Sequence, residues 1–322
     1  MKSVVVRAPT RLDLGGGWTD VPPYTTEVGG RVCNLAIDRY AEVRLDAHSR
    51  SGDADLTITA DTNLAAAAMR RAGVRGVRSS VRSDFPTGAG LGGSSAVSVA
   101  LAAALRTWSQ QDIGDREHLV QESRAAEVED AGIAGGWQDH YAAAFGGMLD
   151  LTFAATNVVR PLPLPPALRT AIERRCLVFY TGQSRLSGDT ITAVLDAYRA
   201  REPGVLRCLA GMKRLAGDMA DAMTSGDLDA LGDLLDEHWA FQRALHPAIT
   251  TPRIDALLAG TRRAGARGGK ALGASGGGCV LVVADDGRED EVRAAGTDAA
   301  QPLRFAIDTA GVHVLHIDDA EA

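Results

Sequence analysis

Apolar and polar positions alternate along the first part of the chain, as they do in β-strands that bury one face. Strands are predicted at residues 3–9, 31–46, 56–60 and 76–81. Good helix formers with apolar residues on one face then follow. They predict helices at residues 62–72, 94–110 and 116–131. Because these strands mostly precede the helices, the pattern favours an α+β fold over a doubly wound sheet.

Four prolines between residues 161 and 166 interrupt the regular pattern near the middle of the chain. They predict a crossover between an N-terminal lobe, residues 1–160, and a C-terminal lobe, residues 167–322. In the second lobe the periodicity predicts a strand at residues 176–181, helices at 188–201, 204–224, 228–245 and 252–264, a strand pair within 270–284 and a last strand at 312–317. This last strand is expected to close the second lobe.

Composition and charge narrow the class of function. Hydrophobic residues make up 45% of the 322 residues and charged residues 23%, which is ordinary for a folded globular protein. The net charge of −7 argues against nucleic acid as a partner. The four cysteines form no zinc or disulfide pattern, so a reducing cytoplasm is expected. No apolar run approaches the roughly 18 residues of a membrane span, and no targeting segment is predicted.

A glycine-rich segment at residues 86–96, PTGAGLGGSSA, follows a predicted strand and leads into a predicted helix. Glycines allow several backbone N–H groups to turn toward one point, and the start of a helix favours an anion there. The segment is therefore a candidate phosphate-binding loop. The alternative is a tight strand-to-helix turn with Ser94 as the N-cap.

Three other familiar motifs also contain glycines at fixed spacings. The lysine of a P-loop is absent. The spacing of Gly88, Gly90 and Gly93 fits a dinucleotide fingerprint, but the acidic residue expected roughly 20 positions later is missing. Gly273, Ser275 and Gly277 match a nucleophile elbow, which needs a following helix where a strand is predicted. A nicotinamide-dependent oxidoreductase therefore stays open as a weak alternative, and a hydrolase is disfavoured.

Together with residues 7–20, RAPTRLDLGGGWTD, and residues 273–278, GASGGG, the loop resembles three motifs of the GHMP kinases, the superfamily of galactose, homoserine, mevalonate and phosphomevalonate kinases. Residues 136–147, 180–185 and 251–255 are similar to its sugar-1-kinase branch, which holds heptose 7-phosphate kinases and L-fucose kinases. The resemblance implies a two-lobed α+β fold. It has an N-terminal mixed sheet with helices and a C-terminal ferredoxin-like lobe.

The resemblance also implies ATP and Mg²⁺ as cofactors. The residues that would wrap the ATP phosphates are Gly88, Gly90, Leu91, Gly92, Gly93, Ser94 and Ser95. Ser94 is the expected magnesium ligand, with Ser95 as its near alternative. The expected acidic ligand is Glu127, with Glu129 as the alternative, although a solvated helix face explains any one glutamate equally well.

Asp139 is the residue expected to act as catalytic base. A sugar hydroxyl is a poor nucleophile at neutral pH, and a carboxylate held against it can accept its proton as the phosphoryl group transfers. By resemblance, Arg11 is expected beside the transferred group, where it would neutralise charge. The competing accounts are a helix cap for Asp139 and a surface position for Arg11.

The acceptor is expected to be a small sugar or sugar phosphate, and the substrate-binding residues that the resemblance implies are Trp18, Asp20, Arg31, Arg185, Gly276 and Gly277. Free-standing length favours D-glycero-D-manno-heptose 7-phosphate, phosphorylated at its anomeric C1 hydroxyl. Trp18 favours L-fucose, and a seven-carbon cyclitol phosphate or a non-catalytic sugar sensor stays open. A phosphorylated acceptor needs a second cationic site, for which Arg31, Arg185, Arg253 and Lys270 are candidates.

Two further expectations concern the motif at residues 273–278 and the assembly. Ser275 stands where the family usually has glycine, so a positive φ at this position would strain the backbone. The chain is expected to be a monomer or a homodimer.

Overall fold

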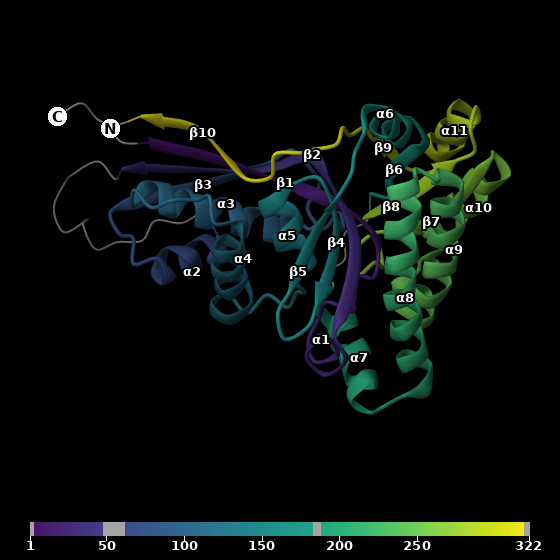
Figure 1. The fold of residues 1–322 in the computed structure, drawn as a ribbon, viewed down its shortest axis with the longest axis horizontal. Helices are drawn as coiled ribbons and strands as arrows, with labels where there is room; N and C mark the ends of the chain where they lie inside the picture. The colour runs from purple at the N-terminus through teal and green to yellow at the C-terminus, as the bar shows by residue number, and fades with distance from the viewer. Residues whose placement is uncertain (1–2, 48–61, 183–187, 319–322) are drawn as a thin grey trace.

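The computed structural model describes residues 3–47, 62–182 and 188–318. A broad sheet occupies one half of the molecule (Figure 1). Its strands run in the order β10 (His313–Asp318), β1 (Ser3–Gly15), β2 (Gly30–Ala47), β4 (Met148–Phe153) and β5 (Val158–Leu162). The long strand β2 pairs with β4 through its first residues and with β3 (Val77–Ser83) through its last ones, so one strand holds both parts of this sheet together.

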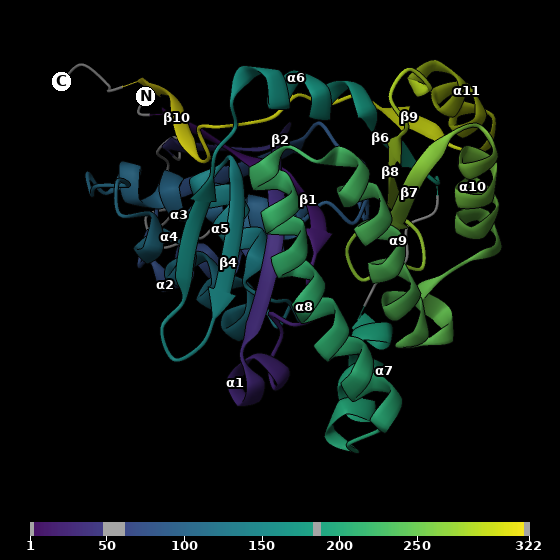
Figure 2. The same ribbon diagram turned by 45° about the vertical axis from the view of Figure 1, so that its right-hand side comes forward.

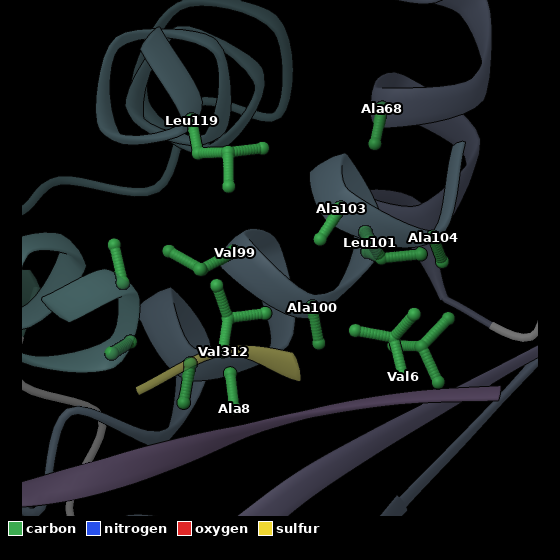
Figure 3. Close-up of a cluster of buried hydrophobic side chains, with 14 of the residues drawn as sticks. Val6, Ala8, Ala68, Val99, Ala100, Leu101, Ala103, Ala104, Leu119 and Val312 are labelled. Atoms are coloured by element: carbon green, nitrogen blue, oxygen red, sulfur yellow. The ribbon is translucent and has the colours of Figure 1, made fainter. Parts of the chain in front are cut away.

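Helices α3 (Gly93–Trp108) and α5 (Gln138–Phe145) lie on one face of this sheet, and α2 (Asn63–Arg71) and α4 (Arg116–Arg124) pack against α3. Figure 3 shows Val99 and Ala100 of α3 lying over Ala8 of β1, with Val312 beside them. The small side chains of α3 let its backbone approach the sheet closely, which brings the start of α3 and the start of α5 near the same strand, β1.

The second lobe contains a four-stranded sheet in the order β7 (Ala266–Ala271), β8 (Cys279–Ala284), β6 (Cys176–Tyr180) and β9 (Gln301–Leu303). Helices follow β6 and β8, which gives the β-α-β-β-α-β order of a ferredoxin-like lobe. The helices are α6 (Pro166–Arg175), α7 (Gly188–Arg199), α8 (Pro203–Ser225), α9 (Leu228–Ala244), α10 (Pro252–Arg263) and α11 (Glu289–Ala299). The α+β fold with a ferredoxin-like second lobe is therefore confirmed.

Helix α8 joins the two lobes, because it also packs on the free face of the first sheet (Figure 2). Met219 and Ala220 of α8 share a buried cluster with Leu12 and Leu14 of β1. Residues 11 and 13 of β1 alternate with these leucines and therefore face the opposite side, toward α5. This alternation sets the polar residues of β1 next to the helices that carry the candidate site.

Three expectations need correction. The last strand, β10, does not close the second lobe but pairs with β1, since Ser3 lies opposite Asp318 in the first sheet. The strand pairs of the described residues in that sheet are antiparallel throughout, so the expected mixed sheet is wrong in this detail. The proline-rich stretch is irregular only at residues 163–165, which lie in no helix or strand: Pro161 lies in the edge strand β5, and Pro166 begins α6, where its missing N–H costs nothing.

Other expectations fall outside what the structure describes or stay open. The strand predicted at residues 56–60 lies outside the described residues, and the lobe boundary near residues 161–166 stays a prediction. The helix predicted at residues 116–131 is α4 continued by a π-helix, Ala125–Asp130. None of the helices in the described ranges combines the length and apolar composition needed to cross a bilayer.

Candidate active site

The candidate phosphate loop connects β3 to α3. Gly88, Gly90 and Gly92 have φ values of 68°, 75° and 74°, which residues with a side chain rarely adopt. Helix α3 begins at Gly93, with Gly92 as its N-cap in the left-handed conformation. The loop therefore ends at the start of a 16-residue helix, whose first N–H groups lack partners within the helix and favour an anion.

This loop lies directly against the second glycine-rich segment, residues 272–278, which connects β7 to β8. A Cβ atom on Gly90 would lie 2.6 Å from the carbonyl oxygen of Leu272. The N–H of Cys279 donates to the carbonyl of Ala89 over 2.7 Å. The two segments come from different lobes, so any side chain at Gly90 would separate the lobes at this point.

Ser275 in the second segment has φ 74°, so this position does adopt the left-handed region. Serine costs more than glycine there. The side chain of Gln242 on α9 supports the segment, because its Nε2 donates to the carbonyl of Gly273 over 2.9 Å and lies 3.4 Å from the hydroxyl of Ser275. Strand β8 follows this segment, and not the helix that a nucleophile elbow requires.

Asp139 and Arg11 form an ion pair beside the phosphate loop. Arg11 Nε donates to Asp139 Oδ1 over 2.7 Å, and Arg11 Nη1 donates to the carbonyl of Gly90, also over 2.7 Å. The Arg11 side chain is 4% exposed and that of Asp139 24%. A Cβ atom on Gly92 would lie 2.9 Å from Asp139 Cγ, so glycine at this position lets the carboxylate lie against the loop.

Glu127 lies in the π-helix that continues α4, and it faces the start of α3. Burial raises its pKa, but interactions with His140, Ser94 and Ser95 outweigh burial, so the pKa of Glu127 is below its usual value. His140 Nε2 lies 3.0 Å from Glu127 Oε2, and its other ring nitrogen lies 3.0 Å from the hydroxyl of Ser123. Glu127 is therefore an ionised, buried carboxylate held between a histidine and two serine hydroxyls.

Glu129, two positions further, faces away from this group. Its carboxylate pairs with Arg71 of α2 over 3.0 Å at the surface. The π-helical turn sets the direction of each side chain here, and such turns are frequent at functional sites. The geometry therefore favours Glu127 over Glu129 as a candidate metal ligand.

Asp20, at the end of the first motif, is buried behind α5. Its Oδ2 accepts the N–H groups of Trp137 and Gln138 over 2.8 and 2.9 Å. Burial raises the pKa of Asp20 to about 6, because it outweighs these hydrogen bonds and because Asp139 and Asp13 are negatively charged neighbours. Gly136 must be glycine next to this carboxylate, since a Cβ atom there would lie 2.0 Å from Oδ2.

Two family models match the chain. The model described as "GHMP kinases N terminal domain" matches residues 60–147, and "GHMP kinases C terminal" matches residues 219–300, together more than half of the chain. The chain belongs to the GHMP kinase family. It is thus a member of a family of phosphotransferases, and the two matched regions contain both glycine-rich segments.

Individual relatives refine this picture. The kinase is 26% identical over 314 residues to the D-glycero-alpha-D-manno-heptose 7-phosphate kinase of Campylobacter jejuni. This alignment covers 88% of the present chain and 90% of that relative. It is also 26% identical over 317 residues to the bifunctional fucokinase/GDP-fucose pyrophosphorylase of Arabidopsis thaliana. This second alignment covers 87% of the present chain. The kinase spans only 30% of the length of that second relative.

Solved structures agree on the fold. A D-glycero-D-manno-heptose 1-phosphate kinase from Bacteroides thetaiotaomicron superposes with a TM-score of 0.77 at 24% identity, over 98% of the kinase and 100% of that chain. The galactokinase of Lactococcus lactis complexed with galactose superposes with a TM-score of 0.72 at 16% identity, over 97% of the kinase and 94% of that chain. At these identities the likeness shows the shared fold.

Several residues expected at the substrate lie elsewhere or have other partners. Arg31 projects toward Asp150 of β4, which its Nε and Nη2 both contact over 3.0 Å, and it packs on Gly217 of α8. Arg253 donates to the carbonyl of Ala299 at the surface. These two arginines are therefore not brought to the site. Arg185 lies outside the described residues.

Lys270, the remaining candidate for a second cationic site, is fully buried in the kinase. Its ammonium lies 3.0 Å from Asp13 Oδ2 and donates to the backbone carbonyls of Asp13 and Leu14. All of its contacts are thus made inside the protein, so the expectation that it binds a substrate phosphate is wrong.

The remaining substrate candidates lie near the site. Trp18 has φ 77° and is buried in a cluster with Tyr24 and Tyr198, yet its Nε1 has no acceptor among the described residues. Gly276 and Gly277 have φ values of 82° and 155°, and the N–H of Gly276 donates to the carbonyl of Ile249 over 2.9 Å. Backbone strain and an unpaired polar atom at Trp18 are typical of functional sites.

Sequence reasoning missed three residues of this region: Asp13, His140 and Arg124, whose guanidinium carbon lies 4.0 Å from the ring centre of Trp137. Asp13 follows Arg11 by two positions on one strand, so period-2 alternation puts both side chains on the same face. His140 directly follows Asp139, and Arg124 precedes Glu127 by three positions, which is one helical turn. Each of the three could have been predicted from its spacing to a residue already chosen as a candidate.

The raised pKa of Asp20 predicts an unusual pH dependence of stability. The folded-state pKa of about 6 lies above the unfolded value of 3.8, so the folded kinase holds a proton that the unfolded chain loses across this window. The free energy of unfolding should therefore fall by about 3 kcal/mol as pH rises through the window. Asp20→Asn should remove this fall and make the kinase more stable than wild type at pH 7.

Urea unfolding of wild type and Asp20→Asn at pH values from 4 to 8 measures the difference directly, because contributions of other groups cancel in it. A difference that stays constant with pH would contradict a raised pKa for Asp20.

Proposed function

We propose that this kinase transfers the γ-phosphoryl group of ATP to the anomeric C1 hydroxyl of D-glycero-D-manno-heptose 7-phosphate. The observation that carries the proposal is the ion pair of Asp139 and Arg11, held within reach of a glycine-rich loop at the start of α3. The choice of acceptor is supported by the Campylobacter jejuni relative, with which the kinase aligns over 90% of that protein's length.

Asp139 is the proposed base. Its Oδ1 is held by Arg11, and the exposed part of its carboxylate can accept the proton of the acceptor hydroxyl. As the acceptor oxygen forms its bond to the γ-phosphorus, the bond from that phosphorus to the bridging oxygen breaks and ADP leaves. Arg11 is anchored to the loop through the carbonyl of Gly90, so its positive charge stays next to the reacting groups. Positioning and charge neutralisation of this kind supply most of the rate in phosphoryl transfer.

Glu127, Ser94 and Ser95 are the residues that would hold Mg²⁺. Among the described residues there is no cluster of three histidine, cysteine or acidic side chains, so oxygen atoms of the nucleotide would complete the coordination. The fit rests on Glu127, a buried carboxylate beside Ser94 and Ser95, whose Oε2 lies 3.0 Å from His140 Nε2 but has no hydrogen bond of good geometry among the described residues. When bound by these residues, magnesium would supply positive charge that stabilises the negative charge of the transferring phosphoryl group. His140 keeps the Glu127 carboxylate in place.

The acceptor would lie between Asp20 and Asp139. Asp20 uses Oδ2 for the backbone at the start of α5, which leaves Oδ1 for sugar hydroxyls. Trp18, Gly276 and Gly277 would complete the pocket. L-fucose is the second candidate acceptor, favoured by the 26% identity to the bifunctional fucokinase. The four cysteines are buried free thiols, which supports a cytoplasmic location. A monomer or homodimer remains the expected assembly.

The test is release of ADP with ATP and Mg²⁺ across heptose 7-phosphate, L-fucose, galactose and mannose, with NMR of the anomeric proton to locate the new phosphate. We expect turnover with heptose 7-phosphate and phosphorylation at C1. A preference for free L-fucose would show that L-fucose is the acceptor, as Trp18 suggests, in place of heptose 7-phosphate. ATP binding without ADP release for every acceptor would contradict the proposed function and favour a sensor.

A further inference from the structure

Arg124, the last residue of α4, is a partly buried arginine without an anionic hydrogen-bond partner. Its guanidinium carbon lies 4.0 Å from the ring centre of Trp137. Its Nε is buried and has no acceptor, and among the described residues no carboxylate forms an ion pair with it. Partly buried arginines normally find such partners, because removing a charge from water is costly.

The surroundings of Arg124 are those of the candidate acceptor site. The residue on which it stacks, Trp137, donates its backbone N–H to Asp20 over 2.8 Å. Glu127 follows Arg124 by one turn of helix. Burial lowers the pKa of Arg124, and the carboxylates of Asp20, Glu129 and Glu127 are the charges that oppose this shift. The positive charge of Arg124 thus interacts with the negative charge of Asp20, while no carboxylate of the described residues forms an ion pair with it.

Three of the other cations considered for a second phosphate have partners within the protein, and the fourth, Arg185, lies outside the described residues. Arg31 is held by Asp150, Arg253 by the carbonyl of Ala299, and Lys270 by Asp13. Stacking on Trp137 fixes the plane of the Arg124 guanidinium, which prepares its two terminal nitrogens to donate to two oxygens of one phosphate group.

We propose that Arg124 binds the phosphate group of the acceptor and thereby selects a sugar phosphate over the free sugar. This inference rests on the proposed function, since it assumes that the acceptor lies at Asp20 and Asp139. The Arg124 side chain stacks on Trp137, the residue that precedes α5, and α5 carries Asp139. Residues 137–139 would therefore fix the distance between Asp139 and the phosphate group that Arg124 binds.

The experiment compares Arg124→Met and Arg124→Lys with wild type, using heptose 7-phosphate and the same heptose without its phosphate. Methionine keeps an unbranched side chain over Trp137 but removes the charge. We expect Arg124→Met to raise the KM for heptose 7-phosphate about tenfold or more, with lysine intermediate. The KM for ATP and the kcat/KM for free heptose should not change.

Arg71→Met is the matched control, because Arg71 is a partly exposed arginine that pairs with Glu129 and Asp130 on the outer side of the π-helix. It should leave both acceptors unaffected. Equal losses of Arg124→Met on both acceptors, or a raised KM for ATP alone, would overturn the proposal.

Binding of inorganic phosphate, measured by calorimetry, separates this proposal from the proposed function. If wild type turns over no acceptor yet binds phosphate through Arg124, the phosphate site stands and the acceptor is wrong. Equal phosphate binding by wild type and Arg124→Met would overturn the site whatever the acceptor.

Discussion

Asp139→Asn should lower kcat about 10²–10⁴-fold, the usual contribution of a general base, and leave the KM for ATP nearly unchanged. Asparagine keeps the size of the side chain and can still accept a hydrogen bond from Arg11. It cannot accept the proton of the acceptor hydroxyl. Single-turnover measurement of ADP formation at saturating ATP isolates the chemical step from nucleotide binding.

Asp150→Asn is the control for this substitution. Asp150 is likewise an aspartate paired with arginines, since it accepts from Arg31 and Arg160, but it lies on β4 away from Asp139. Its replacement should lower stability while kcat stays within about twofold of wild type. A kcat of Asp139→Asn within tenfold of wild type would rule out Asp139 as the base.

The fold could be read from the sequence where short-range patterns decide the structure. Alternation marked β2 to within one residue of its observed start and end, and helix-forming composition marked α3 and α8. The position of β10 could not be read in this way, because its partner β1 lies at the other end of the chain. Local pattern specifies a strand, whereas the neighbour of that strand depends on contacts across the whole molecule.

The residues of the candidate site were also predictable from the sequence only in part. Family motifs pointed to Arg11 and Asp139, and the structure brings them together across 128 positions of sequence. Arg31 and Lys270 were candidate phosphate ligands because they are positively charged and lie near a motif. In the structure they pair with Asp150 and Asp13, which are distant in sequence. Charge near a motif therefore does not predict a free charge, because a buried ion finds its partner only in the folded state.

The pair formed by Lys270 and Asp13 connects the lobes behind the site. Lys270 lies on β7 of the second lobe and is 0% exposed, and Asp13 lies on β1 of the first sheet. Burial raises the pKa of Asp13, but the charges of Lys270 and Arg11 outweigh burial and hold it below its usual value. From Lys270 through Asp13 and Arg11 to Asp139, positive and negative side chains alternate.

Lys270→Met should therefore destabilise the kinase by about 3–5 kcal/mol, since it leaves the Asp13 carboxylate buried without its partner. It should also lower kcat, because the uncompensated Asp13 then competes with Asp139 for Arg11. The double variant Asp13→Asn with Lys270→Met should recover much of the stability. Lys213→Met should cost little, because Lys213 is a partly exposed lysine that forms no ion pair among the described residues and donates to the carbonyl of Val28. Urea unfolding measures all three. A loss below about 1 kcal/mol for Lys270→Met would show that the pair of Lys270 and Asp13 does not hold the lobes together.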